Sequence, residues 1–203
     1  DRMLAVDECG EVVDGDQLMS ICGNYMKQKG TLKKNTIVAT VMSNLGMFLM
    51  GEREGIHIEK TKVGDRYVLE NMLENGYNIG GEQSGHIIFL DENTTGDGLL
   101  SALHLLQVMT ETKKKLSELA SIMEVLPQAL VNAKVPNHKK EHFEEYAEIA
   151  EAIAEVEAKF AGEGRVLIRP SGTEPLVRVM IEGKDQQLIE SEAQKLAELI
   201  SSI

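Results

Sequence analysis

The 203-residue sequence predicts an α/β protein: a mixed, largely parallel α/β sheet domain followed by a smaller α+β domain. Strand-like and helix-like periods alternate from residue 36 to residue 90, which is typical of parallel strands joined by right-handed crossovers. Residues 125–203 instead combine two amphipathic helical segments with two strands around a short loop, which is typical of an antiparallel sheet with two helices on it. We therefore place a domain boundary near residue 124.

Composition and charge restrict the classes of function. The 42% hydrophobic and 27% charged residues are ordinary for a globular protein. A formal charge of −12 opposes non-specific binding to nucleic acid or to an anionic membrane, so we expect neither partner. No apolar run approaches the ~18 to 20 residues of a membrane span, and the start lacks a signal-peptide pattern. Two cysteines, Cys9 and Cys22, are too few for a zinc site or a disulfide framework and favour reduced thiols in the cytoplasm.

The opening residues predict two short strands, at 3–6 and 12–13, with nothing before them to pair with, so the chain looks truncated. Asp14-Gly15-Asp16 then precedes apolar residues at helical spacing up to Gly30. An EF-hand loop opening at Asp14 would need Glu at its twelfth position, where Tyr25 stands, so we favour helix capping over calcium binding.

The next pattern predicts strands at 36–41, 56–60 and 86–90, an extended piece at 77–79, and helices at 43–52 and 65–74. Ligands of parallel sheets bind outside the carboxyl ends of the strands, which selects the loops at 42–44, 63–66 and 80–85. A further helix from residue 97 to 109 is almost wholly apolar, so we expect it to be buried on several sides. One more helix is expected at 116–123, and we interpret His57 and His104 as packing residues.

In the second domain, residues 128–135 stand between two prolines, which makes this stretch extended or loop-like at its ends. Apolar residues from 143 to 160 trace one face of a helix. Strands at 166–169 and 177–182 flank a six-residue loop at 170–175, and Asp185 is expected to cap the final helix.

The loop between these two strands is the best candidate for an anion site. Ser171, Gly172 and Thr173 can present successive backbone N–H groups and two hydroxyls, while Arg169 and Arg178 supply fork-shaped donors suited to a phosphate dianion. A rigid hairpin with solvated arginines is an equally good interpretation of these residues alone.

A second candidate is the glycine-rich stretch from Gly80 to His86. Its glycines let the backbone approach a ligand closely, and Glu82 with Ser84 can bind neighbouring sugar hydroxyls. A plain glycine-rich turn remains the alternative. His86 is a candidate acid or base, although a lone His that begins an apolar strand is more often structural.

These two loops resemble the sugar-binding and phosphate-binding loops of the α-D-phosphohexomutase family. The resemblance rests on residues 82–86 and 169–178, with two further matches at 40–44 and 63–68. Within the family the chain resembles the phosphoglucosamine mutase subgroup, because phosphomannomutase relatives place a Lys near Met42 and a His near Asp65. The resemblance covers essentially the whole chain, and four motifs in the right order make it specific.

The resemblance implies an intramolecular phosphotransferase of the isomerase class. It would interconvert glucosamine 6-phosphate and glucosamine 1-phosphate through a phosphoserine enzyme and a 1,6-bisphosphate, with Mg²⁺ as cofactor, for cell-wall amino-sugar synthesis. A sugar phosphate is the expected partner, and a homodimer is left open. The implied site residues are His86, Asp65 and Arg66 for catalysis, Glu82, Ser84, Gly85, Arg169, Ser171, Gly172, Thr173 and Arg178 for substrate binding, and Asp1 for the metal.

The family has four domains, with the phosphorylated serine in the first and a magnesium loop of pattern Asp-x-Asp-x-Asp-Arg in the second. By resemblance, residues 1–12 would end that second domain, residues 13–124 would be the sugar-binding domain and residues 125–203 the phosphate-binding domain. We therefore expect the isolated chain to be inactive. The alternatives are a phosphoglucomutase or phosphomannomutase of the same family, and a non-catalytic sugar-phosphate binding module.

Overall fold

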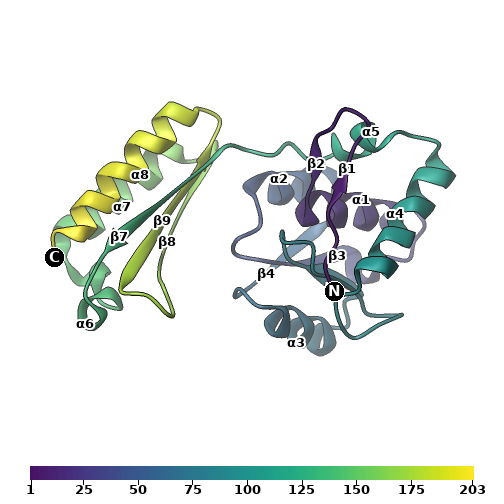
Figure 1. Cartoon of the computed structure of the whole chain (residues 1–203), viewed down its shortest axis with the longest axis horizontal. Coiled ribbons are helices and arrows are strands. Elements are labelled where there is room, and N and C mark those ends of the chain that lie inside the picture. Colours follow the sequence, from purple (N-terminus) through teal and green to yellow (C-terminus); the bar gives the residue numbers. More distant parts are fainter. The chain divides into compact units, whose positions relative to one another are not determined.

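The computed structural model describes residues 1–203 and divides into two units, Asp1–Val125 and Leu126–Ile203 (Figure 1). Each unit has its own hydrophobic core, and no core cluster contains residues of both. None of the helices combines the length and the apolarity that a membrane span requires.

The first unit is built on a four-stranded sheet with the order β4-β3-β5-β6. Its strands are β3 (Thr36–Thr40), β4 (His57–Thr61), β5 (Ile79–Gly81) and β6 (Ile87–Phe89). Strands β4 and β5 run parallel to β3, whereas β6 pairs antiparallel with β5. The prediction of a mixed, largely parallel sheet is confirmed.

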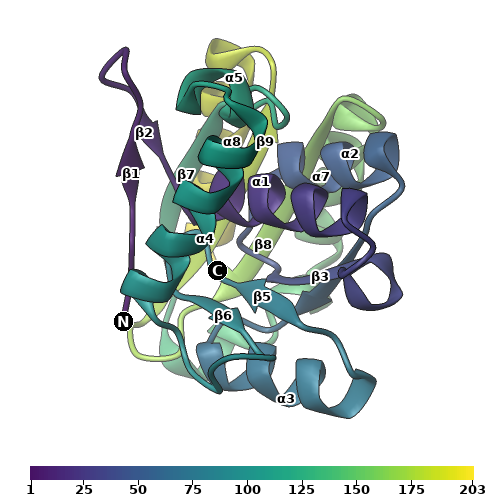
Figure 2. The same ribbon diagram turned by 90° about the vertical axis from the view of Figure 1, so that its right-hand side faces the viewer.

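Helices cover both faces of this sheet. They are α1 (Gly15–Gln28), α2 (Leu45–Glu54), α3 (Asp65–Asn75), α4 (Gly98–Thr112) and α5 (Leu116–Ala120), with a short 3-10 turn, η1 (Lys33–Asn35), before β3. Ile37 and Ala39 of β3 belong to the core with α1 and α2, while Val38, between them, packs with Val68 and Met72 of α3. Figure 2 shows α3 alone on one side of the sheet.

Capping residues set the starts of these helices. Asp14 and Gln17 form a capping box at the start of α1, which confirms the helix-cap interpretation. Asn44 caps α2 and Asp97 caps α4 through their side-chain oxygens. The hairpin of β1 (Ala5–Val6) and β2 (Val12–Val13) precedes α1.

Two expectations for this unit are wrong. Helix α4 is not buried on several sides: Leu99 is 74% exposed, and Leu103 and Leu106 are exposed with it, because only the face carrying Leu105 and Val108 packs on the core. His57 is not a packing residue, since its exposed ring lies beside Glu59, 2.9 Å from the carboxylate.

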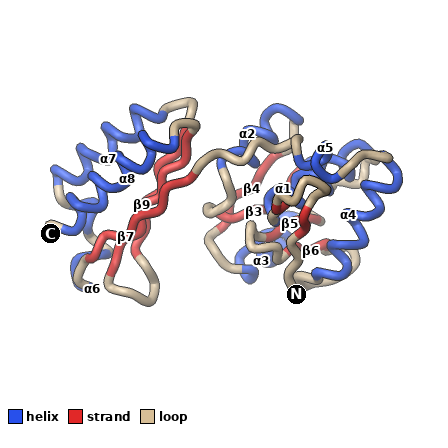
Figure 3. Tube along the Cα trace, turned by 45° about the horizontal axis from the view of Figure 1, so that its top comes forward, coloured by secondary structure: helices blue, strands red, loops and turns tan.

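The second unit is a three-stranded antiparallel sheet with the order β7-β9-β8. Its elements are β7 (Gln128–Lys134), α6 (Asn137–Lys140), the 3-10 turn η2 (Phe143–Glu145), α7 (Ala147–Phe160), β8 (Gly164–Pro170), β9 (Leu176–Gly183) and α8 (Gln186–Ser201). Val177, Val179 and Ile181 of the central strand pack into the core with α7 and α8. Figure 3 shows both helices on one face of the sheet.

The helix expected from residue 143 begins only at Ala147, because Tyr146 adopts an extended backbone that separates η2 from α7. The loop between β8 and β9 has five residues, 171–175, since Pro170 still pairs with Val177. Asp185 caps α8 as predicted.

Candidate functional site

The turn at residues 82–85 joins β5 to β6 at the carboxyl end of β5. The N–H of Glu82 donates to the carbonyl of His86, and the N–H of Gly85 donates to the carbonyl of Glu82, each at 3.0 Å. Gly85 has a φ of +90°, and a Cβ there would lie 2.0 Å from the carbonyl oxygen of Met3. Position 85, a predicted site residue, therefore requires glycine both for its positive φ and for the close approach of Met3.

Helix α1 holds the same turn from the other side. The N–H of Gly15 donates to the carbonyl of Gln83 at 2.9 Å. A Cβ at Gly15 would lie 2.2 Å from the carbonyl oxygen of Glu82. Gly15 thus lets the first turn of α1 touch the backbone of the turn directly.

The carboxylate of Glu82 is fixed at the start of α3. Its Oε1 accepts a hydrogen bond from the N–H of Gly64 at 3.0 Å, and the hydroxyl of Ser84 donates to Oε2 at 3.4 Å. Ser84 is exposed and Glu82 is half-buried. A carboxylate oriented in this way can still accept hydrogen bonds from hydroxyl groups of a ligand.

His86 lies between two carboxylates and is only 5% exposed. Its Nε2 accepts a hydrogen bond from the N–H of Gly96 at 3.2 Å, so in the neutral ring Nδ1 carries the proton and donates to Oδ2 of Asp1 at 3.3 Å. Oδ2 of Asp65 lies 3.8 Å from Nε2. The structure therefore brings Asp1, Asp65 and His86 together, with both ring nitrogens engaged.

Arg66 does not point toward this group. Its side chain is 80% exposed and bonds to Glu70 on the next turn of α3 at 2.7 Å, and this contact raises the pKa of the guanidinium. Asp65 accepts a hydrogen bond from the N–H of Arg66.

Residues 1–203 contain no group of three or more His, Cys, Asp or Glu side chains that could hold a metal. Asp1 is exposed and could offer a carboxylate oxygen, but His86 is already committed to Gly96 and Asp1. Because Mg²⁺ takes octahedral oxygen coordination, this donor set does not make a magnesium site by itself.

In the second unit, Arg169 of β8 and Arg178 of β9 are directly paired in register. Like charges in this position repel each other. Burial lowers the pKa of the Arg169 guanidinium, and the charge of Arg178 lowers it further. Arg178 has a carboxylate neighbour in Glu174 at 3.2 Å, whereas no ion pair involves Arg169. The two arginines thus leave positive charge beside the loop, which an anion would neutralise.

The loop at residues 171–175 has a closed inner side and an open outer side. Ser171 is buried: its N–H donates to the carbonyl of Leu176, and its hydroxyl accepts from the N–H of Glu174 at 3.2 Å. Gly172 and Thr173 are exposed, and their N–H groups have no acceptor in the protein. Of the predicted loop residues, Gly172 and Thr173 are therefore available to a ligand, while Ser171 shapes the loop.

Three residues that contact these loops were not predicted from the sequence. Gly15 and Gly64 support the turn at residues 82–85, and Lys140 of α6 binds the loop of the second unit through its carbonyl groups. In the sequence, Gly15 stands between Asp14 and Asp16, which indicates only the start of a helix. Lys140 follows Lys139, and no sequence pattern distinguishes one lysine from the other.

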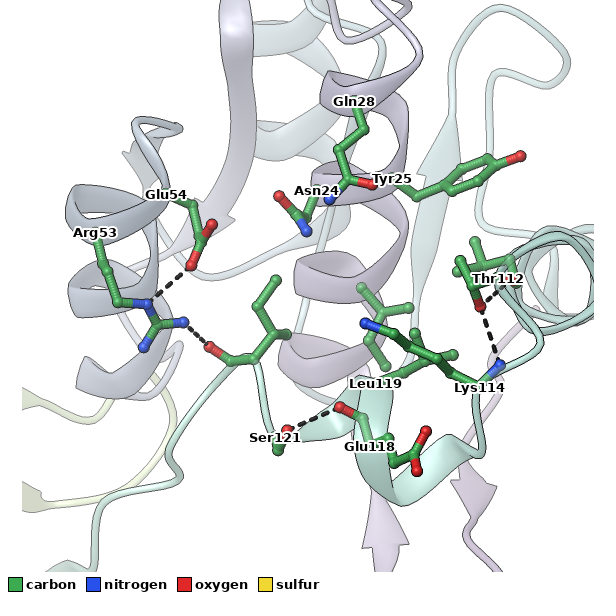
Figure 4. A pocket seen from close by; sticks show the side chains of 13 residues that line it. Asn24, Tyr25, Gln28, Arg53, Glu54, Thr112, Lys114, Glu118, Leu119 and Ser121 are labelled. Atoms are coloured by element: carbon green, nitrogen blue, oxygen red, sulfur yellow. Dashed lines mark hydrogen bonds and ion pairs between the residues drawn. The ribbon is translucent and has the colours of Figure 1, made fainter.

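A polar cavity of about 300 Å³ lies elsewhere in the first unit, between the last turns of α1, α2 and α4 (Figure 4). Asn24, Gln28 and Lys114 line it, and Arg53 donates there to Glu54 and to the carbonyl of Ile122. It contains none of the residues predicted for the site.

Comparisons with known proteins agree with this architecture. Residues 14–126 match the family model described as phosphoglucomutase/phosphomannomutase, alpha/beta/alpha domain III, and residues 130–199 match that of the C-terminal domain. The phosphoglucosamine mutases of Ruminiclostridium cellulolyticum and Acetivibrio thermocellus are each 64% identical over 98% of this chain and 44% of their own length. The chain thus spans less than half the length of these relatives.

Solved structures show the same fold. The N-acetylphosphoglucosamine mutase of Aspergillus fumigatus aligns over 98% of this chain and 45% of its own, with a TM-score of 0.77 and 17% identity. A structure of the Aspergillus fumigatus enzyme with GlcNAc-6P and magnesium aligns over all of this chain and 50% of its own, with a TM-score of 0.74 and 19% identity. The chain belongs to the phosphoglucomutase/phosphomannomutase family and carries its domain III and its C-terminal domain.

Proposed function

We propose that this chain is the sugar-recognising and phosphate-recognising part of a phosphoglucosamine mutase, which interconverts glucosamine 6-phosphate and glucosamine 1-phosphate. The observation that carries the proposal is the pairing of Arg169 with Arg178 beside the free N–H groups of Gly172 and Thr173. Relatives 64% identical over 98% of the chain carry that name. The fold alone is shared by enzymes acting on other sugar phosphates.

The two units would divide the recognition of the substrate. Glu82 and Ser84 would bind sugar hydroxyls, which suits a substrate that must bind in two orientations because these contacts do not depend on which end reacts. The loop with Arg169, Gly172, Thr173 and Arg178 would bind the phosphate that is not reacting and so position the sugar. Ser171 would act by shaping this loop.

The group formed by Asp1, Asp65 and His86 would orient a ligand of the magnesium ion. We propose that Asp1, held by Nδ1 of His86, is one ligand of a Mg²⁺ ion whose other ligands come from outside residues 1–203. Bound magnesium would stabilise charge on the transferring phosphoryl group. Asp65 and Arg66 remain proposed catalytic residues, and His86, with both nitrogens engaged, would act as a positioning residue.

A binding experiment tests this function on the chain itself. Isothermal titration with inorganic phosphate and with glucosamine 6-phosphate should show binding of both to the wild type. Arg178→Met should weaken both about tenfold or more, since it removes a charge-assisted contact. Glu82→Ala should weaken only the sugar phosphate, and Lys184→Met, which removes an exposed charge of the same unit, should change neither.

The absence of phosphate binding by the wild type would overturn the proposed function. If Glu82→Ala weakens inorganic phosphate as much as Arg178→Met does, the division between the two loops is wrong. Tighter binding of mannose 6-phosphate or glucose 6-phosphate than of glucosamine 6-phosphate would favour the other members of the family. A coupled assay of this chain with magnesium and a bisphosphate activator should show no turnover, because the family's serine nucleophile and two of its three metal aspartates are not among these residues.

A further inference from the structure

Lys140, at the end of α6, is a buried lysine with only 8% of its surface exposed. Its Nζ donates to the carbonyl of Ser171 at 2.5 Å and to the carbonyl of Glu174 at 3.2 Å. No ion pair with a carboxylate involves this ammonium group. A buried charge normally requires such a partner, so the two loop carbonyls provide its compensation in the described structure.

The contact with Ser171 fixes one peptide plane of the loop. In a trans peptide, the carbonyl of Ser171 and the N–H of Gly172 share one plane and point in opposite directions. Because the carbonyl is directed at Lys140, the N–H of Gly172 is directed away from it. That N–H group has no acceptor in the protein, and Gly172 is exposed.

The second contact closes the other end of the loop. The carbonyl of Glu174 accepts from Lys140 and also from the N–H of Leu176 at 2.9 Å, where β9 begins. Lys140 therefore joins the two ends of a five-residue loop. Figure 3 shows α6 at the same end of the sheet as this loop.

We propose that Lys140 is a positioning residue for anion binding: it holds the loop so that the N–H of Gly172 is presented to a phosphate group that Lys140 itself does not touch. The inference rests on the proposed function of this loop. It implies that loss of Lys140 lowers the affinity for phosphate by more than the loss of one positive charge elsewhere in the unit.

The test compares two lysines near the loop in the ¹⁵N-labelled chain. Lys140→Met removes the contacts to both carbonyls, whereas Lys134→Met removes an exposed charge at the end of β7 that makes no contact with them. Titration with inorganic phosphate gives the Kd from amide shifts, with the Gly172 amide as the local signal. We expect Lys140→Met to raise the Kd about tenfold and to lose most of the Gly172 shift, and Lys134→Met to raise it less than about twofold.

Equal effects of the two variants would overturn the inference while leaving the loop's function intact. A wild-type chain that binds no phosphate would overturn the function and the inference with it. If Lys140→Met loses the dispersed spectrum of the second unit, Lys140→Gln decides, because its neutral amide can still donate to one carbonyl. Its Kd must exceed that of Lys134→Met, and an equal Kd contradicts the proposal.

Discussion

Cys22, on the buried face of α1, belongs to the core with 3% of its surface exposed, and burial raises the pKa of its thiol to about 12. Cys9 is exposed in the turn between β1 and β2, where the charge of Asp7 is the largest of the causes that raise the pKa of its thiol. The thiolate is the reactive form of cysteine. The two thiols should therefore differ in access, and the exposed one should respond to nearby charge.

We predict that a disulfide reagent such as DTNB modifies one thiol per native chain at pH 8 and the second only after unfolding in guanidinium. Asp7→Asn should speed the reaction of Cys9, because removing the carboxylate charge lowers the thiol pKa and raises the thiolate fraction at a given pH. Glu157→Gln, which removes an equal charge from an exposed position on α7, is the control.

Asp7 also accepts hydrogen bonds from the N–H groups of Cys9 and Glu11, so Asp7→Asn could speed the reaction by loosening the turn as well as by removing a charge. The salt dependence of the reaction rate distinguishes these two effects. Added NaCl should speed the wild-type reaction more than that of Asp7→Asn. Two equally reactive thiols in the native chain would contradict the burial of Cys22.

The candidate site could be predicted from sequence only where chemistry and local spacing coincide. Arg169 and Arg178 stand at the ends of two strands around a short loop, so their proximity follows from hairpin geometry. The contact of Lys140 with Ser171 joins residues 31 positions apart and depends on how α6 packs, so no local pattern contains it. The burial of Ser171 could not be predicted for the same reason.

At the scale of elements, apolar periodicity located the helices better than it located their buried faces. Helix α4 carries more leucines than its contact with the core needs, and the sequence does not distinguish Leu99 and Leu103 from Leu105. The apolar spacing from residue 143 continues through Tyr146, where the backbone is extended. The sequence therefore predicts one helix where the structure has a 3-10 turn followed by a helix. The strands and their parallel order were predictable because their alternation with helices admits few topologies.

The contact of α1 with the turn at residues 82–85 makes a prediction about Gly15. Alanine favours helices over glycine by ~1 kcal/mol in a helix interior, so propensity alone would not make Gly15→Ala destabilising. The added Cβ would, however, lie 2.2 Å from the carbonyl oxygen of Glu82, which is backbone and cannot rotate away. We expect Gly15→Ala to lower the free energy of unfolding of the first unit by about 1 to 3 kcal/mol, the usual cost of overpacking.

Urea denaturation measures this change, and the amide shift of Gly85 reports whether the turn has moved. Asn24→Ala, on the same helix and away from the turn, should change the free energy of unfolding by less than about 0.5 kcal/mol. A Gly15→Ala chain as stable as the wild type with an unchanged Gly85 signal would show that the contact is not needed.

At the scale of the whole molecule, the hydrophobic cores lie within separate units. Ile37 belongs to a core of residues between 13 and 123, and Ile181 to a core of residues between 129 and 200. Both side chains are fully buried. Units with their own cores can unfold separately, in which case a single free energy of unfolding does not describe the chain.

We predict that a core substitution in one unit leaves the unfolding of the other in place. Ile181→Ala should destabilise the second unit by ~2 to 5 kcal/mol through lost contacts and a cavity, and Ile37→Ala should do the same in the first unit. Residue-resolved amide intensities in a urea series give a midpoint for each unit, so every variant supplies its own internal reference. We expect each substitution to shift only the midpoint of its own unit. A common shift of both midpoints in both variants would show that the chain unfolds as one cooperative body despite its two cores.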